Sequence, residues 1–229
     1  MINMWIDSYY IVLVLPALLL SIWAQAKVQS TFSKYSKVFS HKGITGRETA
    51  ETILRENGVY DVSVQQTGGS LTDNFNPMNK TVNLSQPVYD VSSVAAIGVA
   101  AHETGHAIQH NVGYIPIKLR NAVLPVANIG ANAAMPVAIL GFIMGLPMLV
   151  NIGIVLFSAV VLFQLVTLPV EFNASARALN ILKNGYILTD DELKGAKKVL
   201  TAAALTYVAA MLTSLMSLIR LILLTRNRD

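Results

Sequence analysis

Residues 121–170, NAVLPVANIGANAAMPVAILGFIMGLPMLVNIGIVLFSAVVLFQLVTLPV, form a run of 50 residues without a charged side chain. As one helix the run would measure about 75 Å, more than twice the ~30 Å hydrocarbon core of a bilayer. It must therefore fold back, and the break is expected near Gly145-Leu146-Pro147 or Asn151, where glycine, proline and asparagine favour a turn. We interpret 121–170 as a transmembrane helical hairpin, in which small residues such as Gly130 and Gly141 permit close packing.

Two further uncharged runs are long enough to cross a membrane. Residues 8–26 lie between Asp7 and Lys27. A cleaved signal peptide is the alternative for this run, but the residues before it include Asp7 and neither lysine nor arginine, so we expect an uncleaved anchor. Residues 199–219 precede Arg220, and we expect a C-terminal span over 199–225 in which Arg220 reaches the interface. A membrane-lying or re-entrant helix is the alternative for this last run.

The composition of the whole chain agrees with a membrane protein. Of its 229 residues, 53% are hydrophobic and 13% are charged, against about 25% charged in a typical soluble domain. These values exclude a disordered protein, a fibrous protein and an ordinary soluble enzyme. The chain has no cysteine, which excludes disulfides, thiolate metal sites and cysteine nucleophiles. Its net charge of +4 is dispersed along the chain, so we expect a lipid bilayer and no nucleic acid as a partner.

Lysine and arginine also predict how the chain is oriented. Residues 27–120 hold nine of them and residues 171–198 hold five. The positive-inside rule therefore places both segments in the cytoplasm. Arg226 and Arg228, which would lie on the other side, are a mild contradiction of this orientation.

Local patterns predict a small α+β part within 27–120. Thr45-Gly46-Arg47-Glu48 matches a capping box and predicts the start of a helix. Residues 60–86 contain two short runs of alternating apolar residues separated by turn signals, so we expect an antiparallel hairpin or meander there. A second helix is expected to begin near Asp90–Ser93 and to continue to about Asn111.

The motif that carries chemistry lies on this second helix. Residues 102–106, His-Glu-Thr-Gly-His, match the pattern H-E-x-x-H. Residues four apart lie on one helix face, so His102 and His106 could together bind a Zn²⁺ ion. Glu103 could take a proton from a water molecule that attacks a polarised carbonyl group. Gly98 and Gly105 are poor helix formers, and we expect them to mark close approach of another backbone.

A third zinc ligand must come from elsewhere in the chain. The metzincin pattern needs a histidine at the position of Val112, so it fails. His110 lies one turn beyond His106 but is poorly placed to share the same tetrahedral ion, and we expect it to support the site or to be an ordinary polar residue. Glu171 fits best, because the hairpin returns it to the membrane face that carries His102 and His106. The alternative is that Glu171 is an interfacial carboxylate at the end of a span.

These observations define the expected fold class and its parts. We expect a mainly α-helical integral membrane protein with about four transmembrane helices and a small α+β, zincin-like cytoplasmic subdomain that carries the HExxH helix. The expected parts are a transmembrane helix at 8–26, the zincin-like part at 27–120, the hairpin at 121–170, a cytoplasmic segment with the third ligand at 171–198 and a C-terminal transmembrane helix at 199–225.

Three stretches of the sequence resemble the YugP-type family of membrane-bound zinc metallopeptidases. They are 71–77 (LTDNFNP), 80–110 (KTVNLSQPVYDVSSVAAIGVAAHETGHAIQH) and 168–178 (LPVEFNASARA). The resemblance covers most of the chain. It implies a neutral zinc metallopeptidase with one Zn²⁺ per chain, His102, His106 and Glu171 as ligands, and Glu103 as the catalytic base. It also implies an integral protein of a bacterial cell membrane.

The segment around Glu171 is also similar to the Glu-x-x-Ala-Asp motif of the CAAX-prenyl and heat-shock membrane proteases. This chain has Ser175 where those proteases have aspartate. If their aspartate orients a ligand histidine, Ser175 does so more weakly or another residue does it. Arg177 could support the site or be a surface residue.

The sequence is compatible with several functions. The first is a membrane-anchored endopeptidase of the gluzincin type, whose peptide or protein substrate lies in extended form beside the strand expected at residues 81–85. An intramembrane zinc protease is the second, although the uncharged run before Glu103 is too short to span. A non-catalytic zinc-binding scaffold or a metal transporter is the third, but the hairpin carries none of the ionisable residues typical of transport paths. The group that stabilises the oxyanion could be any of Tyr60, Tyr186, His110 and Arg177.

Overall fold

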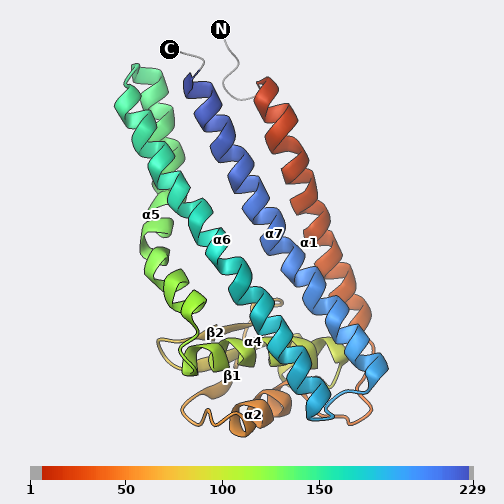
Figure 1. Ribbon diagram of the computed structural model, residues 1–229. Coiled ribbons are helices and arrows are strands. Elements are labelled where there is room, and N and C mark those ends of the chain that lie inside the picture. The colour runs from red at the N-terminus through yellow and green to blue at the C-terminus, as the bar shows by residue number, and fades with distance from the viewer. Residues whose placement is uncertain (1–6, 227–229) are drawn as a thin grey trace. The chain divides into compact units, whose positions relative to one another are not determined.

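The computed structural model describes residues 7–226, and most of this chain is helical (Figure 1). The four long helices are α1 (Leu15–Tyr35), which a π-helical stretch over Tyr10–Val14 precedes, α5 (Ile115–Met144), α6 (Pro147–Asn184) and α7 (Asp190–Arg226). All four, the first counted from Tyr10, are long and apolar enough to cross a membrane, and the mean hydropathies of their apolar windows lie between 1.7 and 2.5. The prediction of about four such helices is therefore confirmed in length and composition.

Helices α6 and α7 are longer than the charge-free runs from which the spans were predicted. The break in the hairpin falls at Gly145 and Leu146, where we expected it. However, α6 continues through Glu171 to Asn184, and α7 begins at Asp190, well before the charge-free run. Glutamate, lysine and arginine are good helix formers, so a charged residue can end a membrane span without ending the helix. Glu171 therefore lies on a rigid helix and not in a loop between spans.

The described chain clusters into two compact units, whose boundaries fall within the long helices. Among the described residues, the first unit consists of 7–25, 118–168 and 205–226. Within it, α5 and α6 pack very closely, since a Cβ atom placed on Gly130 would lie only 2.3 Å from the carbonyl oxygen of Leu156. Small residues thus permit the close packing of the hairpin, as we expected.

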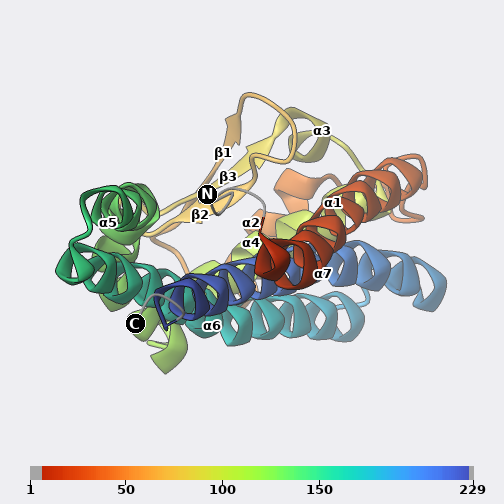
Figure 2. The ribbon, with the colours of Figure 1, turned by 90° about the horizontal axis from the view of Figure 1, so that it is seen from above.

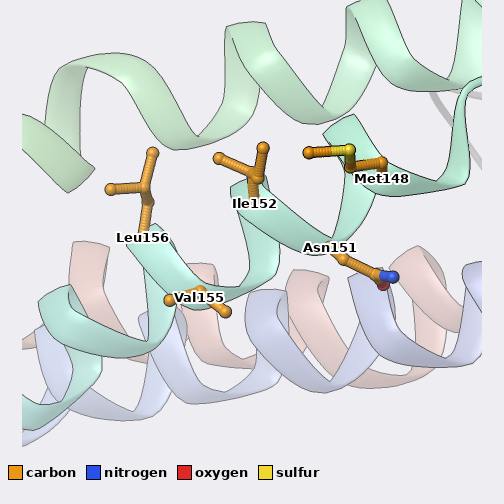
Figure 3. A pocket seen from close by; sticks show the side chains of 5 residues that line it. All are labelled: Met148, Asn151, Ile152, Val155 and Leu156. Carbon is orange, nitrogen blue, oxygen red and sulfur yellow. The ribbon is translucent and has the colours of Figure 1, made fainter.

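A hollow of about 500 Å³ lies along the first turns of α6 in this unit. Its lining residues are Met148, Asn151, Ile152, Val155 and Leu156. Ile152 and Leu156 point toward α5, whereas Asn151 points away from it (Figure 3). The lining is almost entirely apolar, which suits a helix surrounded by hydrocarbon.

An ion pair joins α7 to the residues that precede α1 in the same unit. Arg220 Nη2 and Nε donate to Asp7 Oδ2 over 2.6 and 2.9 Å, and the guanidinium group lies 5.3 Å from the ring centroid of Tyr10. Both side chains are mostly buried, with exposed fractions of 14% for Arg220 and 8% for Asp7. The carboxylate of Asp7 thus neutralises the positive charge of Arg220, which is one of the arginines near the C-terminal end of α7. That Arg220 reaches the membrane interface stays a prediction.

The second unit consists of residues 26–117 and 169–204 and contains a three-stranded sheet. The strands are β1 (Ser63–Thr67), β2 (Asn74–Asn76) and β3 (Thr81–Ser85), in the order β1-β3-β2 (Figure 2). The antiparallel pairing expected for the two runs of alternating residues is wrong, because β1 pairs with β3 in parallel. The strand that does pair antiparallel with β3 is β2, which lies where the sequence showed only turn signals. The connection from β1 to β3 includes β2, and this extra reversal brings the chain into β3 in the direction of β1. Because β3 is the central strand, a peptide cannot pair beside it, contrary to our expectation.

Helix α4 (Val94–Asn111) is the central element of the second unit and carries the H-E-x-x-H motif. It packs against β2, β3, α2 (Gly46–Glu56) and the short α3 (Gln86–Tyr89). Its start is fixed by Ser93, whose side chain accepts a hydrogen bond from Ala96 N, and the predicted capping box of Thr45 and Glu48 is present at α2. Most residues of α4 are buried, so its side chains have little freedom to move.

Candidate metal centre

Helix α4 presents its two motif histidines side by side. The rings of His102 and His106 are 4.7 Å apart between centroids and nearly perpendicular, at 84°. His106 is buried and His102 is partly buried. This arrangement follows from the helical spacing of four residues, which places both side chains on one face about one turn apart.

Glu171 of α6 meets both rings. Its Oε2 atom lies 3.3 Å from His102 Nε2 and 3.5 Å from His106 Nε2. One ligand atom from each of the three side chains can be chosen so that all lie within 4.8 Å of one another. Glu171 is only 2% exposed. We call these three residues the metal centre, since two imidazole nitrogens and a carboxylate oxygen converging in a buried place are a donor set that suits Zn²⁺.

The other ring nitrogen of each histidine also has a partner. His102 Nδ1 lies 3.1 Å from Ser175 Oγ, and His106 Nδ1 lies 3.1 Å from Gln109 Oε1. Both rings are therefore held through Nδ1, which leaves Nε2 for a metal ion, as metal-binding histidines are commonly arranged. Ser175 stands where the similar Glu-x-x-Ala-Asp motif has aspartate, and its hydroxyl contacts His102.

Glu103 lies on α4 between the two histidines in sequence and is 8% exposed. Burial raises the pKa of Glu103 above its ordinary value, although the two neighbouring histidines act in the opposite direction. Burial alone would lower the pKa of His106, but the contact with Glu171, the charges of Glu103 and Glu171 and the contact with Gln109 together outweigh burial, and the pKa is raised. A buried carboxylate with a raised pKa accepts a proton more readily than an exposed one, which suits a general base.

The four candidates for the oxyanion group lie in different places. Tyr60 and Tyr186 are 81% and 79% exposed. His110 lies 5.8 Å from the ring of Phe75 and lines a separate hollow of about 220 Å³ beside the sheet. Arg177 Nε donates to Asn173 Oδ1 over 2.8 Å. Within residues 7–226, the hydrogen bonds and ion pairs described above for His102, His106 and Glu171 involve none of these four residues.

Sequence reasoning missed Gln109 and Asn173. Gln109 is completely buried, and its Nε2 donates to Val170 O over 2.8 Å and to Asn173 Oδ1 over 3.0 Å. The available signal was position: Gln109 follows His106 by three residues, and residues three apart share a helix face. Asn173 had no comparable signal, because only the packing of α6 against α4 brings it to Gln109.

Comparisons with known proteins agree with this geometry. Residues 10–226 match the family described as "Putative neutral zinc metallopeptidase". The chain is 49% identical to the "Putative membrane protease YugP" of Bacillus subtilis (strain 168) over 218 residues, which cover 95% of this chain and 97% of that protein. No solved structure matches the chain. Both similarities extend over nearly the whole sequence, and the chain therefore belongs to this family of neutral zinc metallopeptidases.

Proposed function

We propose that the protein is a membrane-anchored zinc metalloendopeptidase of the gluzincin type. It would bind one zinc ion through His102, His106 and Glu171 and use Glu103 as general base. The observation that carries this proposal is the convergence of both Nε2 atoms on the buried carboxylate of Glu171. A carboxylate in this position would be costly to bury without a cation, and two imidazoles with their Nδ1 atoms already occupied supply the remaining donors.

The chemistry of the proposal divides between the metal and the protein. Zinc bound at this place would polarise the peptide carbonyl and lower the pKa of a water molecule. Glu103 accepts a proton from the water that attacks the carbonyl carbon, and the C–N bond then breaks. Glu103 returns the proton to the leaving amine, so it acts first as a base and then as an acid.

A peptide substrate would lie beside β2. The strand order makes β2 an edge strand, paired with β3 on one side only, and β2 packs against the motif helix α4. Phe75 of β2 faces His110, one turn beyond His106. An extended peptide could form main-chain hydrogen bonds with such an edge while its scissile bond lies near Glu103.

We place the site at the cytoplasmic membrane surface. Helix α4 is not among the four described helices that are apolar enough to span, whereas Glu171 directly follows the charge-free run of α6. The lysine and arginine residues of 27–120 and 171–198 favour the cytoplasmic side. The substrate would therefore be a peptide segment close to a membrane.

The change Glu103→Gln tests this proposal. We expect detergent-purified Glu103→Gln protein to cleave fluorescein-labelled casein about 10²–10⁴-fold more slowly than wild type, because proton transfer is lost. Its zinc content should be unchanged, since Glu103 is not a ligand. Glu51→Gln, on the exposed side of α2, is the matched control and should retain full activity. Cleavage that survives Glu103→Gln would refute the proposal, and zinc binding without any cleavage by wild type would favour a non-catalytic scaffold.

A further inference from the structure

Gln109 is a buried amide with three polar contacts that link α4 to α6. Its Oε1 lies 3.1 Å from His106 Nδ1, and its Nε2 donates to Val170 O and Asn173 Oδ1. Its side chain is 0% exposed, so no water competes for these contacts. A buried amide with fixed partners on both ends cannot rotate without losing hydrogen bonds.

The orientation of the Gln109 amide is determined by two groups, one that can only donate a hydrogen bond and one that can only accept: Arg177 Nε and Val170 O. Arg177 Nε is a donor and cannot accept, so Asn173 must turn its Oδ1 atom toward it. The same Oδ1 atom then accepts from Gln109, whose NH₂ end is also drawn to the carbonyl oxygen of Val170. Gln109 is left with only its oxygen to face His106.

The orientation of the Gln109 amide determines which ring nitrogen of His106 carries the proton. An oxygen that faces His106 Nδ1 requires a proton on that nitrogen. A neutral ring with its proton on Nδ1 has its lone pair on Nε2, and Nε2 is the atom that lies 3.5 Å from Glu171 Oε2. Because Arg177 can only donate, each amide in the chain is fixed in one orientation: Asn173 accepts from Arg177 and from Gln109. Gln109 in turn accepts from His106, which places the proton of His106 on Nδ1.

We propose that Gln109, held by Asn173 and Arg177, is a positioning residue that fixes His106 in the tautomer that binds zinc. This inference rests on the proposed zinc site. It gives Gln109 a role distinct from that of Ser175 at His102, because a serine hydroxyl can donate or accept and so does not select a tautomer. Arg177 has a further contact with the ring of Tyr114, 6.0 Å from its centroid, which holds the start of this chain of contacts in place.

Asn173 offers the sharpest pair of variants. Asn173→Asp keeps an oxygen that accepts from both Arg177 and Gln109, and zinc affinity should stay within about threefold of wild type. Asn173→Leu and Gln109→Met remove the contacts at similar volume, and zinc affinity should fall about 10- to 100-fold, as for other groups that orient metal-binding histidines. Affinity is measured by competition with a chromophoric chelator, and thermal melting in the same detergent shows whether each variant is folded.

A second measurement needs no metal. The chain has four histidines, so ¹⁵N-histidine labelling gives few resonances, and the variant His106→Gln identifies those of His106. In metal-free protein at alkaline pH, the His106 ring of wild type and Asn173→Asp should carry its proton on Nδ1, and Gln109→Met should give a mixture of tautomers. Unchanged zinc affinity and an unchanged tautomer in Gln109→Met would overturn the inference. If wild type binds no zinc, the zinc site fails, while the tautomer measurement still tests the role of Gln109.

Discussion

Gly105 of α4 lies against the backbone of Ala174 in α6. A Cβ atom placed on Gly105 would lie 2.9 Å from the carbonyl oxygen of Ala174 and 3.3 Å from its Cα atom. The two helices can therefore approach this closely only because residue 105 has no side chain. The contact lies next to His106 in sequence and three residues from Glu171, so it determines how far His102 and His106 on α4 lie from Glu171 on α6.

Gly105→Val should consequently weaken the metal centre. Its side chain would push α6 away from α4, and overpacking of this kind typically costs about 1–3 kcal/mol of folding stability. We expect a lower melting temperature, weaker zinc binding and lower peptidase activity. Gly98→Ala is the control, because its Cβ would meet Ala196 Cβ at an ordinary 3.4 Å. Wild-type zinc affinity in Gly105→Val would show that the close approach does not position the ligands.

Ser175 should contribute to zinc affinity through His102. Ser175→Ala removes the contact at 3.1 Å, and we expect a loss of about 10-fold in zinc affinity, at the lower end of the range for such groups. Ser175→Asp should bind zinc at least as well as wild type, because a carboxylate is a stronger acceptor for the Nδ1 proton. The measurement is chelator competition on both variants. Equal affinities for all three proteins would show that Ser175 has no orienting role.

The buried pair of Asp7 and Arg220 should stabilise the first unit. Asp7→Asn leaves the Arg220 charge without its carboxylate, and breaking a buried pair costs about 3–5 kcal/mol. We expect a markedly lower melting temperature in detergent. Asp191→Asn is the control, because the Asp191 side chain is 91% exposed and its ion pair with Lys194 is worth little. A melting temperature equal to that of wild type in Asp7→Asn would contradict the stabilising role.

Zinc binding should weaken on mild acidification. Zinc takes the neutral imidazole, so protonation of His106 competes with the metal. Because its pKa is raised in the metal-free protein, zinc affinity should be greatest well above that pKa and should begin to fall while the pH is still above about 6.5, the ordinary value for histidine. Chelator competition between pH 8.5 and 5.5 gives this curve, and His110→Gln should leave it unchanged. An affinity that is constant down to pH 6 would contradict the expectation.

The sequence predicted the parts of this protein that depend on local pattern. The charge-free run and its break at Gly145, the helix that ends near Asn111 and the pairing of His102 with His106 all follow from periodicity and spacing. The parallel pairing of β1 with β3 could not be predicted in this way, because it depends on which strand the connection places in the middle. The burial of Arg220 against Asp7 depends on two residues far apart in the chain. Asn173 was missed for the same reason, since its contact with Gln109 exists only once α4 and α6 are packed. The contact of Gln109 with His106 lies within α4, and helical spacing could have indicated it.

The zinc content of detergent-purified protein, wild type against Glu171→Ala, tests the central claim most directly. We expect about one zinc per chain in wild type and little or none in Glu171→Ala, because two histidines alone are a poor site. Glu51→Ala, which changes an exposed glutamate, should retain the wild-type content. No zinc in wild type at neutral pH, or zinc retained unchanged in Glu171→Ala, would contradict a site formed by His102, His106 and Glu171.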